Sequence, residues 1–208
     1  MTVVEIWPGG GWYTEILAPV LRAHRKFHVA RFALKARGTP DFRKEVDASY
    51  GALLAGNPDV YGKVVSTELE APEFANNAPA GSADVVLSFR NVHNWRKPGM
   101  ISRLSGVSRC TQAGRNTRRG RASGQTWNSP SMIRTGYMTE AYVIEIAEKA
   151  GFKLAAKSET NANPKDTKDH PKGVWTPPPS LRLGDNDRDK YLAIGESDRM
   201  TLKFVKPK

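Results

Sequence analysis

The sequence predicts an α/β domain with a doubly wound, mostly parallel sheet, and three observations lead to this prediction. Short apolar runs alternate with segments of helical spacing through the first half of the chain. Three consecutive glycines, Gly9–Gly11, follow the first apolar run directly, as in the strand–loop–helix openings that bind nucleotides. The run Asp84–Phe89 (DVVLSF) is apolar enough to lie inside a sheet that is covered on both faces.

The first half of the chain alternates regularly between the two kinds of element. Strands are predicted at Val3–Ile6, Phe27–Phe32, Val64–Thr67 and Asp84–Phe89, and helices at Thr14–Arg22 and Phe42–Ala55. The second helix ends at Asn57-Pro58, because a proline there cannot continue it. Arg37–Asp41 is predicted to form a polar turn and Ala78–Ser82 a loop. This order favours a parallel sheet with helices on both faces.

The second half of the chain is less regular. Tyr142–Ala150 is predicted as an amphipathic helix that Gly151 caps, and strands are predicted at Phe152–Ser158 and Met200–Val205. No helix separates these two strands, so we expect the last one to run antiparallel. The segment between them, residues 160–198, is rich in Pro, Asp and Lys, and predicts a long polar loop or lid, with a solvated connector as the alternative.

Composition limits the class of protein. With 208 residues, 39% hydrophobic and 25% charged, the chain is long enough for one domain with a core, so residues 1–208 are taken as a single domain. The only cysteine, Cys110, cannot form an intramolecular disulfide, and no apolar run is long enough to cross a membrane. Met1 leads almost directly into the first strand, where such a domain normally has a helix, so we expect the N-terminal helix to be missing. The chain as it stands predicts a cytoplasmic protein; a leader lost with that helix would make it periplasmic.

Two motifs carry a family resemblance. The opening EIWPGGGWYTEILAP and the block FRNVHNW at Phe89–Trp95 resemble class I S-adenosylmethionine-dependent methyltransferases. They are similar in particular to a group of bacterial predicted methyltransferases in which these motifs precede a tail containing GYMTEAYV and NPKDTKDHP, as they do here. The resemblance covers most of the chain and implies a Rossmann-like fold and transfer of a methyl group from S-adenosyl-L-methionine to a small-molecule acceptor.

The resemblance also implies which residues form the site. The glycine loop would hold the methionine part of the cofactor, Glu5 would fix the turn or bind the cofactor's amino group, and the edge after the fourth strand would face cofactor and acceptor. The implied cofactor-binding residues are Glu5, Trp7, Pro8, Gly9, Gly10, Gly11, Tyr13, Thr14, Phe89, Arg90 and Asn91. The implied catalytic residues are His93, as a base with a pKa near neutral, and Arg90. The implied substrate residues are Asn94, Trp95, Tyr137, His170 and Trp175.

The end of the second strand departs from the family pattern. Enzymes of this kind carry an acidic residue there that binds the ribose hydroxyls of the cofactor. In this chain the position reads Phe32-Ala33-Leu34-Lys35, and the first carboxylate after it is Asp41. The sequence therefore predicts weak binding through the ribose.

The segment Ile101–Ser131 lacks the apolar fifth strand that the fold requires and carries arginines instead. It contains no Asp or Glu, and its arginines are Arg103, Arg109, Arg115, Arg118, Arg119 and Arg121. We therefore expect a disrupted fifth strand. These six arginines account for much of the net charge of +11, so the charge is poor support for a nucleic-acid partner, and we expect no such partner and no membrane.

A shift of the reading frame would restore the missing pattern. Codons for Cys110–Trp127 exist that, read one base later, encode ALKPGGTLGVVEHRAKPG, which contains a KPGG turn and an apolar strand ending in an acidic residue. In that frame the codons of Met132-Ile133 give a stop, so the normal frame must resume before them. We hypothesise two compensating frameshifts or sequencing errors around this segment.

Three alternative functions require other features of the sequence. An NAD(P)-dependent oxidoreductase needs G-x-G-x-x-G and an acidic residue about 20 residues further on, and both are absent. A basic nucleic-acid-binding protein would use the arginines of residues 103–121, with salt-dependent binding. A damaged and inactive member of the methyltransferase group is the third alternative.

The frame hypothesis is tested by sequencing the gene. We expect the codons of residues 110–127, read one base later, to spell the apolar string given above. Codons whose degenerate positions cannot spell that string would contradict the hypothesis, and the arginine-rich segment would then be genuine.

Overall fold

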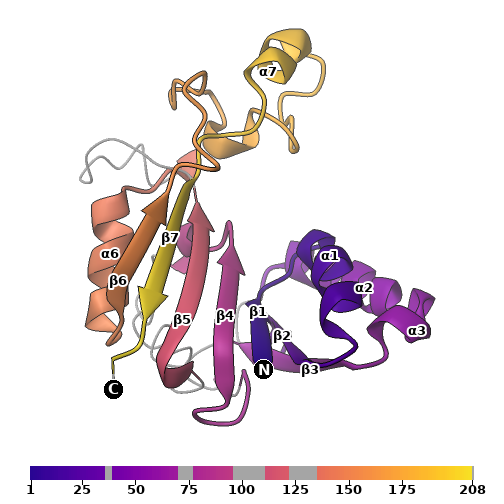
Figure 1. The fold of residues 1–208 in the computed structure, drawn as a ribbon. Helices are drawn as coiled ribbons and strands as arrows, with labels where there is room; N and C mark the ends of the chain where they lie inside the picture. Colours follow the sequence, from indigo (N-terminus) through magenta and orange to yellow (C-terminus); the bar gives the residue numbers. More distant parts are fainter. Residues whose placement is uncertain (36–38, 70–76, 96–110, 122–134, 208) are drawn as a thin grey trace.

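The computed structural model contains one seven-stranded sheet in the order β3-β2-β1-β4-β5-β7-β6 (Figure 1). It describes residues 1–35, 39–69, 77–95, 111–121 and 135–207, of which residues 95 and 111–121 are described by their backbone. The strands are β1 (Thr2–Ile6), β2 (Lys26–Phe32), β3 (Val64–Leu69), β4 (Ala83–Phe89), β5 (Thr111–Arg121), β6 (Lys153–Ser158) and β7 (Met200–Val205). The helices are α1 (Trp12–Leu21), α2 (Asp41–Gly56), α3 (Pro58–Tyr61), α6 (Glu140–Lys149) and α7 (Arg188–Ile194), with the short 3-10 turns η1 (Val92–Trp95) and η2 (Gly173–Trp175).

The sheet is parallel from β3 to β5, and β7 is the strand that runs opposite to the other six. β1 lies between β2 and β4, and Val3 is in register with both Phe27 and Val85. β7 pairs antiparallel with β5 and with β6. The predicted α/β class, the parallel order and the antiparallel last strand are confirmed, and the predicted elements of the first half lie within a few residues of the observed ones.

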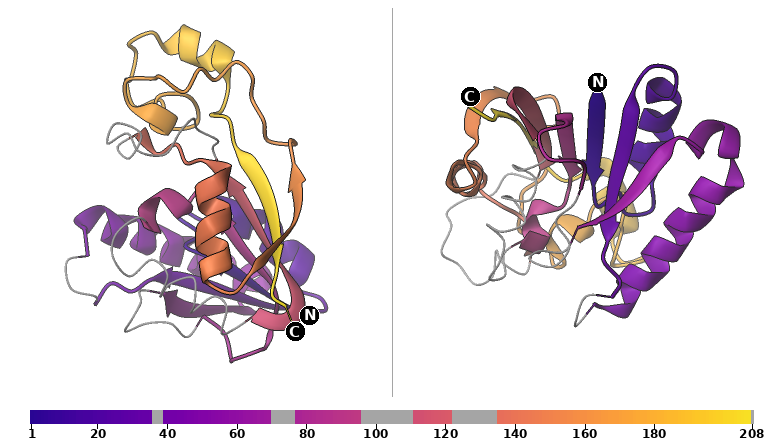
Figure 2. Two further views of the ribbon diagram at one scale, coloured as in Figure 1. Left: turned by 90° about the vertical axis from the view of Figure 1, so that its left-hand side faces the viewer. Right: turned by 90° about the horizontal axis from the view of Figure 1, so that it is seen from below.

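The two faces of the sheet carry separate apolar cores, as the alternation of β1 requires. Val4 and Ile6 belong to a core that α6 covers through Val143, Ile146 and Ala147. Val3, one pleat position away, belongs to the core beneath α1 and α2. The views in Figure 2 show α6 on one side of the sheet and α1 and α2 on the other. A helix layer on each face is the doubly wound arrangement that the sequence predicts.

The expectation of a disrupted fifth strand is wrong for the backbone. β5 occupies Thr111–Arg121 and pairs parallel with β4 and antiparallel with β7. Backbone hydrogen bonds depend little on side-chain identity, and without β5 both β4 and β7 would present an unpaired edge. Residues 116–120 pair with both neighbours, and the shifted frame encodes TLGVV at these positions. The remainder of the segment, residues 101–110 and 122–131, lies outside the described residues.

The long polar segment is a structured unit at one end of the sheet. Phe89 at the carboxyl end of β4 is in register with Gly120 of β5, which pairs with Thr201 of β7, and Thr201 pairs with Ser158 of β6. The chain between β6 and β7 therefore leaves and rejoins the sheet at the edge where β4 ends. It contains η2 and α7, and it lies above the ends of β4 and β5 in Figure 1.

The buried carboxylate of Asp166 holds this segment together. Its oxygens accept hydrogen bonds from the Tyr137 hydroxyl at 2.7 and 2.8 Å, and one of them lies 2.8 Å from His170 Nε2. They also accept from the backbone N–H groups of Lys168 at 2.9 Å and Asp198 at 2.6 Å. Lys168 and His170 are close to Asp166 in the sequence, whereas Asp198 is at the end of the segment and Tyr137 precedes α6. One side chain therefore joins the start and the end of the segment to the chain before α6.

Removing this carboxylate tests its role. Asp166→Ala leaves a buried hydroxyl, a buried N–H group and a partly buried N–H group without their acceptor, so the free energy of unfolding is expected to fall by about 3 kcal/mol or more. Chemical denaturation measures the change. Asp185→Ala, an exposed aspartate of the same segment, is the matched control and is expected to change stability by less than about 0.5 kcal/mol. Equal stability of the two variants would contradict the role given to Asp166.

Candidate functional site

The loop between β1 and α1 is shaped by backbone conformations that favour glycine. Gly9 and Gly11 have φ of 62° and 98°, and Trp7, directly after β1, also has a positive φ of 49°. A Cβ at Gly11 would lie 2.3 Å from Leu53 Cδ2, so a larger residue does not fit there. At Gly9 and Gly10, in contrast, a Cβ would meet nothing within 4 Å. The loop therefore packs against the protein at Gly11 and faces open space at Gly9 and Gly10.

The buried carboxyl group of Glu5, in β1, is joined by a hydrogen bond to the first turn of α1. Glu5 is 1% exposed, and its Oε2 accepts a hydrogen bond from the Thr14 hydroxyl at 2.6 Å. The Thr14 hydroxyl lies 3.1 Å from the hydroxyl of Tyr50, on α2. Glu5 Oε1 is buried and has no hydrogen-bond partner among the described residues. Burial raises the pKa of Glu5 to about 7, although the hydrogen bond from Thr14 acts in the opposite direction.

Asn91 joins the end of β4 to the end of β1. Its Nδ2 donates to the carbonyl of Ile6 at 2.8 Å and to the carbonyl of Trp7 at 3.1 Å. The residue before it, Arg90, has a positive φ of 58°, which turns the chain sharply after β4. The predicted residues after the fourth strand are thus held against the glycine loop by buried hydrogen bonds.

The two predicted aromatic residues of the cofactor region also meet. The ring of Tyr13, in the first turn of α1, stacks on the ring of Phe89 with centroids 3.6 Å apart. The predicted cofactor-binding residues from Glu5 to Thr14 and from Phe89 to Asn91 therefore lie around one edge of β1 and β4. What they bind stays a prediction.

The predicted catalytic and substrate residues lie in different parts of the structure. His93 meets Trp175 of η2 edge-on, with ring centroids 5.3 Å apart, so the segment above the sheet reaches the end of β4. Tyr137 and His170 are 2% and 7% exposed and both bind Asp166, which gives them a structural role. Asn94 is exposed, and the side chain of Trp95 lies outside the described residues.

Two arginines lie near the end of β2, Arg31 on the strand itself and Arg43 on α2. Arg31 forms a two-pronged ion pair with Asp47, at 2.8 and 2.7 Å, so both oxygens of that carboxylate are engaged. The guanidinium of Arg43 lies over the rings of Trp7 and Phe32, at 4.7 and 4.8 Å from their centroids. Sequence reasoning missed Arg43 and Tyr50, because helical spacing places them on α2 without showing that they face the loop.

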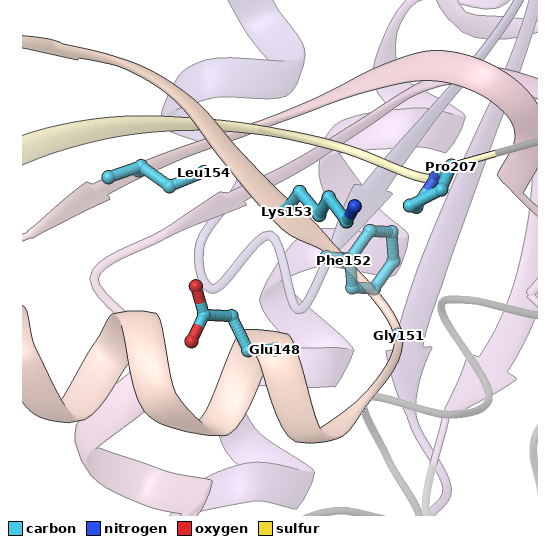
Figure 3. A pocket seen from close by; sticks show the side chains of 6 residues that line it. All are labelled: Glu148, Gly151, Phe152, Lys153, Leu154 and Pro207. Atoms are coloured by element: carbon cyan, nitrogen blue, oxygen red, sulfur yellow. The ribbon is translucent and has the colours of Figure 1, made fainter.

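An open pocket lies elsewhere on the protein (Figure 3). It lies at the end of α6 and the start of β6, and is lined by Glu148, Gly151, Phe152, Lys153, Leu154 and Pro207. Lys153 begins β6, which runs parallel to the first four strands, so this pocket is at the opposite edge of the sheet from the glycine loop. None of the predicted site residues lines it.

The fold is that of S-adenosylmethionine-dependent methyltransferases. A methyltransferase from Aquifex aeolicus superposes with a TM-score of 0.57 at 13% identity, over 99% of this chain and 81% of that one. One from Methanosarcina mazei gives 0.59 at 12% identity, over 99% and 92%. Phosphoethanolamine N-methyltransferase 2 of Haemonchus contortus, in complex with S-adenosyl-L-methionine, gives 0.60 at 14%, over 100% of this chain and 49% of that one.

The comparisons establish the fold and leave the reaction open. The cyclase SpnF superposes with a TM-score of 0.63 at 11% identity, over 99% of this chain and 74% of that one. A protein with this fold can thus carry out a reaction other than methyl transfer. No family model and no characterised sequence matches the chain. Among the described residues, no helix is long and apolar enough to cross a membrane.

The raised pKa of Glu5 predicts a pH dependence of stability. An acid whose pKa is higher in the folded state stabilises the fold below its unfolded pKa, and this contribution is lost as the pH rises through the folded pKa. The free energy of unfolding is therefore expected to fall by up to about 3 kcal/mol between pH 4.5 and pH 7. Glu5→Gln should remove this slope in chemical denaturation, whereas the exposed Glu15→Gln should retain it. An unchanged slope in Glu5→Gln would contradict the assignment.

Proposed function

We propose that the chain binds S-adenosyl-L-methionine at the glycine loop and transfers its methyl group to a small-molecule acceptor. Two observations carry this proposal: the open space at Gly9 and Gly10, and Glu5 Oε1 on the strand before the loop, which is buried without a hydrogen-bond partner among the described residues. A buried carboxylate oxygen without a partner costs free energy unless a ligand supplies the missing hydrogen bond. In a methyltransferase fold, this edge is where the strands end and where ligands of such sheets bind.

The chain's residues fit the cofactor in charge and in shape. Glu5 Oε1 would accept a hydrogen bond from the ammonium group of the methionine part, and ionised Glu5 would pair with its charge. Gly11, at the start of α1, has no side chain that could cap the helix. The N–H groups of the loop and of the first turn of α1 would therefore donate to the carboxylate of the cofactor's methionine part. Asn91 keeps the floor of the loop in place through the carbonyls of Ile6 and Trp7.

The bound cofactor supplies an electrophilic methyl group on a sulfonium. The protein's own contribution is to bind and orient the cofactor and the acceptor, and to exclude water, at the edge between the glycine loop and the segment above the sheet. His93 lies at the start of η1 against Trp175, where both parts of the site meet. Its imidazole would take the proton that the acceptor atom loses.

Binding through the ribose would be weak. Both oxygens of Asp47 are taken by Arg31, and the guanidinium of Arg43 covers Trp7 and Phe32 beside the end of β2. No carboxylate follows β2 in the described residues 33–35. We infer that the affinity for the cofactor comes chiefly from its methionine part.

Calorimetric titration with S-adenosylhomocysteine tests the proposal. The wild-type chain is expected to bind it, and Gly10→Leu is expected to weaken binding by about tenfold or more, because the new side chain fills the open space at the glycine loop. The same variant should fold with nearly unchanged stability, since a Cβ at Gly10 meets nothing. Gly56→Leu, at the exposed end of α2 where a Cβ also meets nothing, is the matched control.

Two results would count against the proposal. A folded wild-type chain that does not bind S-adenosylhomocysteine would favour the damaged and inactive alternative. Binding that survives unchanged in Gly10→Leu would show that the ligand lies away from the glycine loop.

A further inference from the structure

Two arginines lie at the edge of the sheet that faces the proposed cofactor site, and the proposed function does not use them together. Arg90 follows β4 directly, and Arg199 directly precedes β7. Through β5, Phe89 is in register with Gly120 and Gly120 with Thr201, so both arginines lie just beyond the same edge. With strands about 4.8 Å apart, their backbones are on the order of 10 Å apart, within the joint reach of two arginine side chains.

Arg199 is held with part of its guanidinium unsatisfied. Its side chain is 18% exposed, and one terminal nitrogen pairs with Glu196. Its Nε is buried and has no hydrogen-bond partner among the described residues. Burial lowers the pKa of Arg199; nearby Tyr13 raises it, and the charge of Arg90 lowers it. The two cations thus lie near each other, and among the described residues only Arg199 pairs with a carboxylate, that of Glu196.

Arg90 has a strained backbone and no carboxylate partner within the part of the chain that the structure describes. Its φ of 58° is a left-handed backbone conformation that is strained for a residue other than glycine. Glycine would relieve this strain, and the arginine side chain offers no compensating ion pair among the described residues. A guanidinium in this place is best explained by a ligand that it binds.

We propose that Arg90 and Arg199 form the anion-binding end of the acceptor site, so that the methyl acceptor carries a carboxylate or phosphate group. This inference rests on the proposed function, because it places the acceptor beside the glycine loop. Guanidinium groups donate paired hydrogen bonds to both kinds of anion, so the structure assigns the charge and leaves carboxylate and phosphate to experiment.

The aromatic surroundings favour an acceptor with an apolar or aromatic body. The stacked rings of Tyr13 and Phe89 lie beside Arg90, since Phe89 is its chain neighbour. Trp175 reaches the same edge from above through its contact with His93. An aromatic anion would place its ring among these side chains and its charge between the two arginines.

Calorimetric titrations of the full chain, saturated with S-adenosylhomocysteine, test this inference. The probes are benzoate, phenyl phosphate and the neutral benzamide. We expect at least one anion to bind about tenfold or more tightly than benzamide, and the preferred anion identifies the acceptor group. Arg199→Gln and Arg90→Gly should each weaken that anion about tenfold, whereas Arg90→Lys should weaken it less. Arg22→Gln, an exposed arginine at the end of α1, should bind as the wild type does.

The variants also keep folding and binding apart. Arg90→Gly should be at least as stable as the wild type, because glycine adopts a positive φ without strain. Equal binding of benzamide and both anions, or anion binding that neither arginine variant weakens, would overturn the inference. If S-adenosylhomocysteine does not bind, the proposed function fails separately, and the same titrations without it still decide whether the two arginines hold an anion.

Discussion

The buried amide of Asn91 is the contact on which the arrangement of the site depends. At the end of β1, the carbonyl oxygens of Ile6 and Trp7 are buried, and buried carbonyls need a hydrogen-bond donor. The donor is Asn91 Nδ2, just beyond the end of the neighbouring strand β4; it lies 2.8 Å from the Ile6 oxygen and 3.1 Å from the Trp7 oxygen. The hydrogen bonds fix the glycine loop relative to the end of β4. The stacking of Tyr13 on Phe89 and the position of Arg90 follow from this connection.

A second buried polar group, Asp166, holds residues 160–198 in place by hydrogen bonds, as Asn91 holds the glycine loop. Residues 160–198 bury few apolar side chains, so packing alone cannot hold them over the sheet. The Asp166 carboxylate stabilises the segment instead, because it accepts hydrogen bonds from Tyr137, His170 and two backbone N–H groups. The contact between Trp175 and His93 then joins this segment to the carboxyl end of β4. Both halves of the site thus rely on a polar side chain whose hydrogen bonds cross long distances in the sequence.

The electrostatics of the site differ from what the overall charge suggests. The net charge of +11 owes much to six arginines in residues 101–131. The arginines that bear on the site are others: Arg43 over Trp7 and Phe32, and Arg90 and Arg199 at the end of the sheet. A count of charges cannot separate these groups, because the effect of a charge depends on its burial and on its neighbours. Glu5 shows the same dependence, since only its burial raises its pKa.

The sequence by itself determined the alternation of strands and helices, the parallel order of the sheet, the glycine loop and the antiparallel last strand. These follow from local periodicity and turn chemistry, which a single segment contains. It also pointed to Tyr13, Phe89 and Asn91, but through a resemblance and without their contacts. Only the tertiary structure decided that β5 forms despite its arginines, that Tyr137 and His170 serve Asp166, and that Arg199 stands beside Arg90. Each of these depends on pairings between residues far apart in the chain, and long-range pairings leave no periodic signal in the sequence.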